Sequence, residues 1–454
     1  MNRVKRSIVW FRQDLRLHDN EALKKALEHS EEVIPVYVFE QSWFRGKTSY
    51  NFPKIGVYRS QFIIEAVEDL RKSLRQLGID LILRIGDTVE EIFNLAVETQ
   101  AHYVFANMER TYEENKLQNK LEKKLWTIGK ETSFWRGKML YYTQDLPFPI
   151  AHTPDTFSSF RKEVERYTLV REPLEAPSHF KTWTLQVNPG ELPTVEDFGH
   201  QPFTRDKRSA FTLKGGETAA LERLKDYLWE RQLVNNYMKT RNGLIGADYS
   251  SKLSACLAQG CISPKYIYCE LKRYEREVKK NKSTYWLFFE LLWRDFFRLM
   301  GKRYGTRIFR KEGLLEAKHE PMPDNFEKLK EWIDGKTGVP FIDANMLELK
   351  YTGFMSNRGR QNVASYLVKD LKVNWQMGAE YFESVLVDYD VCSNWLNWMY
   401  VAGVGNDPRE NRYFNPITQA KRYDPKGKYI RLWLPQLRDV VQDGSSIHEM
   451  SSRI

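Results

Sequence analysis

Short apolar runs alternate with amphipathic segments through the first third of the chain. The runs at residues 7–11, 33–39, 81–83 and 102–106 have the length and composition of buried strands. Between them lie segments with apolar residues at helical spacing, and Gly78 ends one of these helices. Alternation of this kind with short connections predicts a parallel β-sheet with helices on both faces.

The pattern changes near Leu146. Eight of the 18 prolines fall between residues 146 and 210, where few periodic runs occur, so this stretch reads as a long linker over the surface. Beyond it, helical spacing continues nearly to the end of the chain. We therefore expect a doubly wound α/β parallel-sheet domain over residues 1–145, a linker over 146–210 and an all-α domain over 211–454.

Composition excludes several classes of protein. With 42% hydrophobic and 14% aromatic residues, the chain can bury a core and is not generally disordered. No apolar run approaches the roughly 18 residues that span a bilayer, and the run at 8–11 is too short for a signal peptide. The four cysteines form no Cys-x-x-Cys pair, and the eight histidines show no metal-ligand spacing. We expect a cytoplasmic monomer without disulfides, membrane spans or a metal site.

Basic and aromatic residues interleave between residues 272 and 318. The chain has a formal charge of +10, and this stretch is rich in lysine, arginine and large aromatic side chains. The combination indicates a polyanionic partner whose bases can stack on the protein. A solvated helix face over an aromatic core explains the same pattern equally well.

One predicted helix in this stretch combines aromatic and charged side chains on one face. At helical spacing, Trp286, Glu290, Trp293, Arg294 and Phe297 all share that face. A carboxylate flanked by two indoles loses hydration, so its proton affinity rises unless Arg294 offsets the effect. Glu290 is therefore a candidate hydrogen-bond partner for a ligand in a dry pocket. The alternative is a Glu290–Arg294 surface pair, with the tryptophans facing the core.

Two segments further along combine amides with charged side chains. Amides match the amide and imide edges of a ligand, and arginine matches phosphate or carboxylate. Carboxylates beside amides and indoles suit a polar heteroaromatic ligand. For the first segment, an exposed polar helix start is the alternative. The residues concerned are Asn357, Arg360 and Gln361 in the first segment, and Asp390, Asn394 and Trp398 in the second.

Taken together and in this order, these segments resemble the photolyase/cryptochrome flavoprotein family, and within it the DASH-type cryptochromes. The similarity runs from about Ser7 to Leu437, and residues 11–20 are similar to the family's opening signature. The segments that indicate the DASH group are 240–252, 353–362, 390–394 and 403–411.

The resemblance implies a U-shaped FAD in the helical domain, with residues 250–254 around its phosphates. Hydroxyls, backbone N–H groups and a lysine suit a pyrophosphate. Asn394 matches the residue that faces flavin N5, where an amide tolerates several redox states. The implied FAD contacts are Tyr237, Ser250, Ser251, Lys252, Leu253, Ser254, Arg294, Asn357, Arg360, Asp388, Asp390 and Asn394.

The resemblance also implies a cavity above the flavin that receives a flipped cyclobutane pyrimidine dimer. Gln361 and Tyr400 stand where duplex-repairing relatives carry methionine and a second tryptophan, which makes the pocket more polar. Extrusion from a duplex costs a few kcal/mol, so a weaker clamp favours dimers in single strands. The implied substrate and DNA contacts are Arg241, Glu290, Trp293, Phe297, Asn357, Arg358, Gln361 and Tyr400, with Glu290, Asn357 and Asn394 as the catalytic residues.

The implied activity is that of a deoxyribodipyrimidine photolyase, in which blue light drives an electron from reduced FAD to a dimer in UV-damaged DNA. Two alternatives remain open: a photoreceptor that signals without repair, and a light-independent flavoprotein that binds nucleic acid. About 17 residues follow Leu437, little material for the output tail of signalling relatives. Asn394 also favours repair.

The resemblance has two further implications for light absorption and electron supply. Glu109 matches a folate-contacting position, so we expect 5,10-methenyltetrahydrofolate rather than a deazaflavin as antenna chromophore. Relatives pass electrons to excited oxidised flavin through three tryptophans, of which Trp398 matches the proximal one and Trp375 the middle one. Met322 stands at the distal position. We therefore expect slow photoreduction, with the electron hole resting on Trp375 or moving to a nearby tyrosine.

Overall fold

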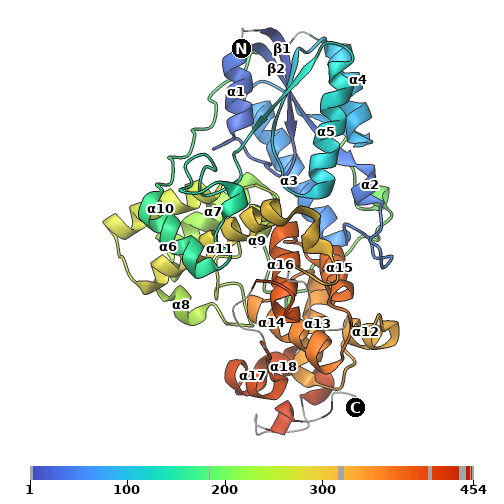
Figure 1. The fold of residues 1–454 in the computed structure, drawn as a ribbon, viewed down its shortest axis with the longest axis vertical. Coiled ribbons are helices and arrows are strands. Elements are labelled where there is room, and N and C mark those ends of the chain that lie inside the picture. The colour runs from blue at the N-terminus through green and yellow to red at the C-terminus, as the bar shows by residue number, and fades with distance from the viewer. Residues whose placement is uncertain are drawn as a thin grey trace.

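The computed structural model of the protein describes residues 4–181, 183, 185–314, 322–406, 412–438, 446–449 and 451. Within them the chain forms an α/β part followed by a helical part (Figure 1). This confirms the predicted fold class. Residues 407–411, which end one of the family-like segments, lie outside the described residues.

Five parallel strands form the sheet, in the order β3-β2-β1-β4-β5. Trp10 of β1 pairs with Val36 of β2 on one side and with Ala106 of β4 on the other. The sequence does not predict β5, because only one of its five residues is buried and it has no apolar run. The strands are β1 (Val4–Phe11), β2 (Ser30–Glu40), β3 (Ile82–Gly86), β4 (Tyr103–Asn107) and β5 (Glu131–Trp135).

Helices cover both faces of the sheet: α1 (Glu21–His29), the single turn α2 (Gln41–Phe44), α3 (Val57–Gln76), α4 (Thr88–Thr99) and α5 (Tyr112–Trp126). Because side chains alternate along a strand, each strand contributes to two cores. Val9 and Phe11 of β1 pack in the core with α1 and α3, while Ile8 and Trp10 pack in the core with α4 and α5. Figure 1 shows the sheet between these two layers, as the alternating pattern predicts.

Among the described residues of the stretch predicted as a linker, one α-helix occurs, α6 (Phe157–Tyr167), with single 3-10 turns at Ile150–His152 and Glu196–Phe198. Phe157 and Phe160 are buried, which anchors α6 on the helical part. Further on, Pro189 runs beside the edge strand β3 and accepts a hydrogen bond from the backbone N–H of Leu83 (2.7 Å). The linker therefore covers an edge of the sheet that would otherwise be open to pairing.

The helical part is organised around the long helix α11 (Lys282–Tyr304). The side chain of Asn281 caps its start by accepting from the backbone N–H groups of Ser283 and Thr284, and Gly305 ends it. α16 (Val391–Ala402) packs against both α11 and α15 (Trp375–Val385). None of the helices in the described ranges is long and apolar enough to cross a membrane.

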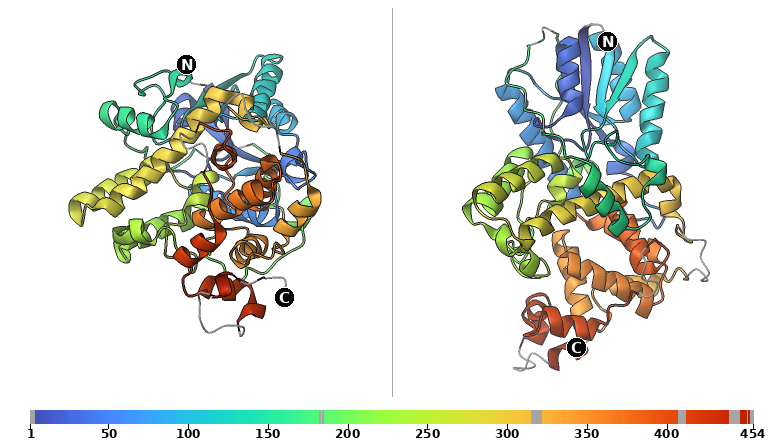
Figure 2. Two further views of the ribbon diagram at one scale, coloured as in Figure 1. Left: turned by 60° about the horizontal axis from the view of Figure 1, so that its bottom comes forward. Right: turned by 60° about the vertical axis from the view of Figure 1, so that its left-hand side comes forward.

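The remaining helices are α7 (Glu217–Lys225), α8 (Tyr237–Thr240), α9 (Ser254–Ala258), α10 (Pro264–Glu277), α12 (Phe326–Ile333), α13 (Pro340–Thr352), α14 (Asn357–Ser365), α17 (Pro416–Tyr423) and α18 (Lys428–Trp433). Figure 2 shows the two parts from further sides, with the sheet at one end of the molecule and α17 and α18 (red) at the other. The sheet and these last helices are therefore far apart, and the contacts of α3 with the helical part include α7 and α15.

Arg16 joins the two parts beyond the carboxyl end of β1. Its side chain is among the largest that are fully buried, and its guanidinium donates to the carbonyl oxygens of His18, Asp19, Gly137 and Gly260 at 2.7–3.0 Å. The backbones approach closely here, since a Cβ on Gly260 would stand 2.1 Å from a main-chain carbonyl oxygen. One side chain thus satisfies carbonyls on segments far apart in the sequence.

We expect Arg16→Met to destabilise the protein strongly. Methionine fills much of the volume but leaves four buried carbonyls without their donor, and each unsatisfied buried group costs about 1–3 kcal/mol. The thermal unfolding midpoint, followed by circular dichroism, should fall by roughly 6 °C or more. Arg45→Met is the matched control, because Arg45 is exposed and donates only to the carbonyl of Asp197. Equal midpoints for the two variants would contradict the role of Arg16.

Candidate functional site

Two of the polar segments identified in the sequence meet around one cavity. Its volume is about 110 Å³, and it is bounded by α14, by the residues preceding α16 and by α16 itself. Arg412, which the sequence did not single out, also contributes to its wall. The predicted residues in the wall are Asn357, Arg360, Gln361, Asp388, Asp390, Asn394, Trp398 and Tyr400.

An ion pair fixes one side of this cavity. Nη2 of Arg360 lies 2.9 Å and 2.8 Å from the two carboxylate oxygens of Asp388. The Nε of Arg360 donates to the carbonyl of Met355 (2.9 Å), which holds the guanidinium in place. Because Asp388 is buried, the two charges are screened little by solvent. The pair presents a fixed set of donors and acceptors to a ligand.

Asn394 is oriented by the backbone of the neighbouring helix. Its Nδ2 donates to the carbonyl of Ala379 in α15 (3.0 Å), and the side chain is buried. The amide oxygen of Asn394 can therefore accept a hydrogen bond from a ligand in the cavity. Trp398 follows one turn later in α16. Its ring has room because position 378 is a glycine, where a Cβ would stand 2.3 Å from that ring.

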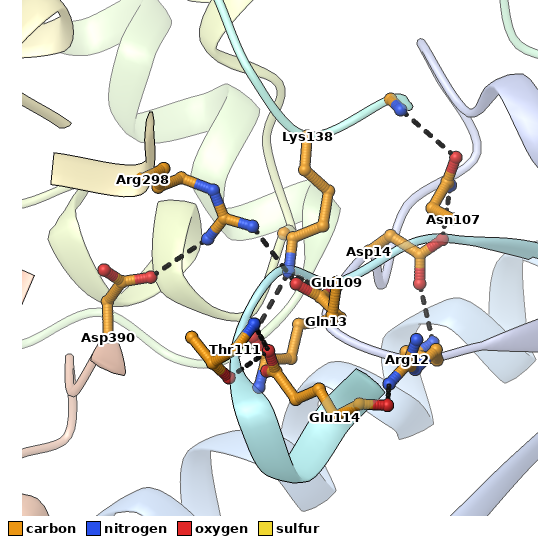
Figure 3. Close-up of polar contacts among 12 residues, drawn as sticks. Arg12, Gln13, Asp14, Asn107, Glu109, Thr111, Glu114, Lys138, Arg298 and Asp390 are labelled. Atoms are coloured by element: carbon orange, nitrogen blue, oxygen red, sulfur yellow. Dashed lines mark hydrogen bonds and ion pairs between the residues drawn. The ribbon is translucent and has the colours of Figure 1, made fainter. Parts of the chain in front are cut away.

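A chain of buried charges runs from this cavity into the α/β part (Figure 3). Asp390 caps α16 by accepting from the backbone N–H of Ser393 (2.8 Å) and pairs with Arg298 (3.2 Å). Arg298 also pairs with Glu109 (3.1 Å), and Glu109 pairs with Lys138. Burial opposes ionisation of both carboxyl groups, but the effect of the neighbouring cations is larger. Lys138 and Arg298 hold the pKa of Glu109 below its usual range, and Arg298 does the same for the pKa of Asp390. Burial lowers the pKa of Lys138 to about 8.

The loop before α9 holds a buried lysine. Lys252 has a left-handed backbone (φ 62°), and its Nζ lies 3.0 Å from the centre of the Tyr249 ring. Among the described residues, neither this Nζ nor the Tyr249 hydroxyl has a hydrogen-bond partner. Burial holds the pKa of Lys252 well below its usual value. A buried lysine amino group without a hydrogen-bond partner indicates that an anionic ligand completes the site. The other predicted residues here are Ser250, Ser251 and Leu253 in the loop, Ser254 at the start of α9 and Tyr237 at the start of α8.

Glu290 has its partner outside its own helix. Nη2 of Arg241 lies 2.7 Å from Oε1 of Glu290, and the Arg241 guanidinium lies 5.4 Å above the Trp286 ring. Burial raises the pKa of Glu290, and Arg241 offsets part of this rise. The alternative of a Glu290–Arg294 pair is wrong. Arg294 instead donates to two main-chain carbonyls at 2.9 Å and 3.2 Å, between the α/β part and α9.

Tyr400 connects the cavity with α11. It lines the cavity, and its ring packs edge-on against Phe297 (5.5 Å between centroids) and Trp293 (6.2 Å). Trp293 stacks in turn on Phe157 of α6 at 3.8 Å, a contact that the sequence does not indicate. Phe297 is buried and lies behind Tyr400. Of these aromatic residues, Tyr400 alone lines the cavity.

Arg358 and Gln361 belong to one polar cluster beside the cavity. Nη1 of Arg358 donates to Oε1 of Gln361 (2.8 Å), and Nη2 donates to Oδ1 of Asn242 (3.0 Å). The guanidinium also lies 4.6 Å above the ring of Tyr423. These contacts fix the orientation of the Gln361 amide.

Comparisons with known proteins agree with this geometry. A family model described as DNA photolyase matches residues 7–178, and one described as the FAD binding domain of DNA photolyase matches residues 286–453. The Cryptochrome DASH of Xenopus laevis is 48% identical over 436 residues, which cover 95% of this chain and 83% of the relative. The chain belongs to the DASH cryptochromes of the photolyase/cryptochrome family.

Solved structures support the same assignment. The crystal structure of a cryptochrome from Synechocystis sp. matches with a TM-score of 0.94 at 44% identity, over 99% of this chain and 92% of the other. A class III photolyase from Agrobacterium tumefaciens matches with a TM-score of 0.84 at 28% identity, over 99% and 90%. The resemblance stated from the sequence is thus confirmed for the family and the fold. The domain limits at 145 and 210 stay predictions, and the first family match continues to residue 178.

The residues of this DASH cryptochrome fit the flavin that its FAD-binding domain implies. The unpaired ammonium of Lys252 suits a pyrophosphate. The oriented amide of Asn394 and the Arg360–Asp388 pair suit the polar edge of a flavin ring. Three independent features therefore match two chemical parts of one cofactor.

A second, larger cavity lies beyond the carboxyl ends of β1 and β2, next to α15 and α16. Its volume is about 550 Å³, and its wall contains Glu109, which the sequence assigned to the antenna chromophore. Topology offered a signal for it, because ligands of open parallel sheets bind beyond the carboxyl ends of strands where the strand order reverses. The wall residues that bear on function below are Gln376, Glu383, Tyr389, Asp390 and Trp395.

We expect Arg241→Gln to raise the pKa of Glu290 further, since the substitution removes the cation that opposes the effect of burial. In the variant, the pKa of Glu290 in the folded state then exceeds its pKa in the unfolded state by more than in wild type. As pH rises through the folded-state pKa, the variant should therefore lose more stability than wild type does. At a pH where Glu290 is protonated in both proteins, the difference should vanish. Carbon-13 NMR of labelled glutamate measures the titration. Arg273→Gln, which breaks the surface pair with Glu270, is the control and should leave Glu290 unchanged.

Proposed function

We propose that the protein is a blue-light-driven, FAD-dependent photolyase that splits cyclobutane pyrimidine dimers, preferentially in single-stranded DNA. The observation that carries the proposal is the link through Tyr400 between two groups of side chains. Tyr400 lines the cavity that contains Asn394 and packs against Trp293, which lies about one helical turn from the Glu290–Arg241 pair. This proximity supports a site in which a flavin and a damaged base meet.

When bound and reduced, the flavin supplies an electron to the dimer under blue light. The residues of the chain hold the dimer and adjust the charge around it. Burial makes Glu290 retain a proton more readily than an ordinary glutamate, so it can donate a hydrogen bond to a pyrimidine carbonyl as negative charge develops there. Arg241 adds a positive charge beside the same carboxyl. Asn394 and Asn357 hold the polar edges of the flavin and of the dimer, so that the two ligands stay aligned.

The same proposal assigns the FAD pyrophosphate to the loop at 250–254. Lys252 supplies the cation, and the backbone of this loop is fixed because Arg223 donates to the carbonyls of Ser250 and Ser251 at 3.0 Å. A phosphate beside Lys252 would restore the ammonium, because an opposite charge offsets the effect of burial. FAD binding should therefore stabilise this loop.

We expect Lys252→Gln to weaken FAD binding by about 10- to 100-fold, because a charge-assisted hydrogen bond contributes about 1.5–3 kcal/mol. The fluorescence of released FAD, measured during dialysis at fixed ionic strength, gives the dissociation constant. Lys239→Gln removes an exposed lysine on α8 and should bind FAD as wild type does. Equal FAD affinity for both variants would move the pyrophosphate away from Lys252.

The preference for single strands follows from how Gln361 is held. Its amide is engaged by Arg358, which is tied to Asn242, so this wall of the cavity is polar and rigid. A polar wall gives a dimer less apolar contact than a methionine would. Less binding energy is then available to offset extrusion from a duplex.

We further propose that the 550 Å³ cavity holds an antenna chromophore, 5,10-methenyltetrahydrofolate rather than a deazaflavin. The volume lies in the range of about 300–1,000 Å³ that is usual for organic ligands. Glu109 contributes a carboxylate to the wall, kept ionised by Lys138 and Arg298, and a pterin ring presents N–H donors to such an acceptor. Extraction of the pigment and its absorption spectrum would identify it.

We expect Glu290→Ala to retain FAD and lose most repair, because the carboxyl contacts the substrate and not the cofactor. Loss of a charge-assisted hydrogen bond in a dry site should lower the rate by about 10- to 100-fold. Repair of a dimer in single-stranded DNA under blue light measures the effect, with the paired duplex at the same salt as comparison. Glu277→Ala, at an exposed glutamate on α10, is the control. Repair without light, or equal repair of both DNA forms by wild type, would contradict the proposal.

A further inference from the structure

Tyr389 lies in the walls of both cavities. Its hydroxyl donates to Oε2 of Glu383 (2.8 Å) and accepts a hydrogen bond from the indole Nε1 of Trp395 (3.1 Å). The ring of Trp395 packs edge-on against Trp375, with 5.7 Å between centroids. A continuous series of contacts thus leads from Trp375 to a tyrosine whose hydroxyl is already bonded to a carboxyl group.

In the other direction from Trp375 lies Tyr50, whose hydroxyl accepts from the Nδ2 of Asn374 (2.8 Å) and donates to Asp324 (3.1 Å), but its ring packs on Phe326. The position expected for a distal tryptophan holds a thioether. The backbone N–H of Asn374 donates to the carbonyl of Pro323 (3.0 Å), which brings residues 322–324 to the start of α15 beside Trp375. The side chain at this place is Met322, which is half-buried against the core. A thioether gives up an electron much less readily than an indole. An oxidised Trp375 is therefore better reduced through Trp395.

We propose that Tyr389 is the terminal electron donor for flavin photoreduction in this protein, reached from Trp375 through Trp395, with Glu383 as its proton acceptor. The inference rests on the proposed function, because the oxidant that starts the sequence is photoexcited oxidised FAD. Trp398 and Trp375 carry the electron hole outward, as the family resemblance implies, and Tyr389 ends the path.

The last step balances in electrons and protons. One electron leaves the Tyr389 phenol and reduces the Trp395 radical cation to the neutral indole. The phenol proton moves along the existing hydrogen bond to the carboxylate of Glu383, which leaves a neutral tyrosyl radical and a neutral carboxylic acid. A small thiolate that reaches Tyr389 while the large cavity is free of chromophore can later donate one electron and leave as a thiyl radical, and the proton then returns from Glu383 to Tyr389.

The surroundings of Tyr389 favour a neutral radical over a charged one. The guanidinium of Arg59 lies 4.6 Å above the ring, so a positive charge on the ring would be repelled and the proton must leave with the electron. Burial raises the pKa of Tyr389, which keeps the phenol protonated before oxidation. Burial also raises the pKa of Glu383, which makes its carboxylate a stronger proton acceptor than an exposed glutamate.

The test identifies the radical directly. Protein loaded with oxidised FAD is given one blue flash and freeze-quenched, and electron paramagnetic resonance is recorded with ordinary and with ring-deuterated tyrosine. Wild type should give a tyrosyl signal that narrows on deuteration. Tyr389→Phe and Trp395→Phe should abolish that signal and leave only a shorter-lived tryptophan radical. Tyr381→Phe, at a buried tyrosine packed on Trp332, is the control and should behave as wild type.

A second variant tests the proton acceptor. In Glu383→Gln the amide cannot take the phenol proton, so tyrosyl formation followed by transient absorption should slow at least about tenfold. Wild type should slow in D₂O, and this isotope effect should disappear from the Glu383→Gln protein. If Glu383 has only a structural role, the Glu383→Gln protein should form the tyrosyl radical at the wild-type rate and with the wild-type isotope effect.

The outcomes separate this inference from the proposed function. A flash-induced tryptophan signal without tyrosyl in wild type, or an undiminished tyrosyl signal in Tyr389→Phe, would overturn the role of Tyr389 while leaving FAD and repair intact. Failure of wild type and of Tyr381→Phe to retain FAD would instead overturn the proposed function, and this inference with it. Loss of dimer repair in otherwise radical-competent protein would bear on the proposed function alone.

Discussion

The pairing of Arg298 with both Glu109 and Asp390 is the contact on which most of the site depends. Glu109 and Arg298 are buried and Asp390 is largely so, and loss of one partner of a buried pair costs about 3–5 kcal/mol because a charge is left uncompensated. The cation therefore holds one carboxylate of the α/β part and one of the helical part at fixed positions. Because Asp390 also caps α16, the same pairing fixes where α16 begins and therefore where Asn394 lies.

Two ligand cavities share a wall at this point. Tyr389 and Asp390 line both the 110 Å³ cavity and the 550 Å³ cavity, and Glu109 lines only the larger one. A molecule that binds to Glu109 in the larger cavity acts on Arg298, and Arg298 is the partner of the aspartate in the smaller one. On the proposed function, this series of ion pairs would couple the two sites by contact as well as by light.

Periodicity in the sequence predicted the elements but not the contacts between distant segments. Alternating apolar runs predicted four strands and the doubly wound sheet, whereas β5 escaped because its residues are mostly exposed. Helical spacing placed Glu290 correctly on an aromatic face, yet suggested Arg294 as its partner because that pair is local. The real partner, Arg241, comes from a separate helix end, and no local rule predicts such a contact. Of the large cavity, the sequence assigned Glu109 to an antenna chromophore but not the rest of the wall, which comes from both parts of the chain.

Two features that lower the stability of the folded state lie where ligands are expected. Lys252 combines a left-handed backbone with an unpaired buried charge, and Glu290 carries a carboxyl group whose ionised form is disfavoured. Either feature alone would be selected against in a purely structural protein, because each lowers the stability of the folded state. Arg16 and Arg298 are also buried cations, but the terminal nitrogens of both guanidinium groups are engaged by carbonyls or carboxylates on both parts of the chain, although the Nε of Arg298 has no partner among the described residues. The amino group of Lys252 has no such partner at its charged end, which distinguishes a residue that awaits an anionic ligand from the residues that hold the fold.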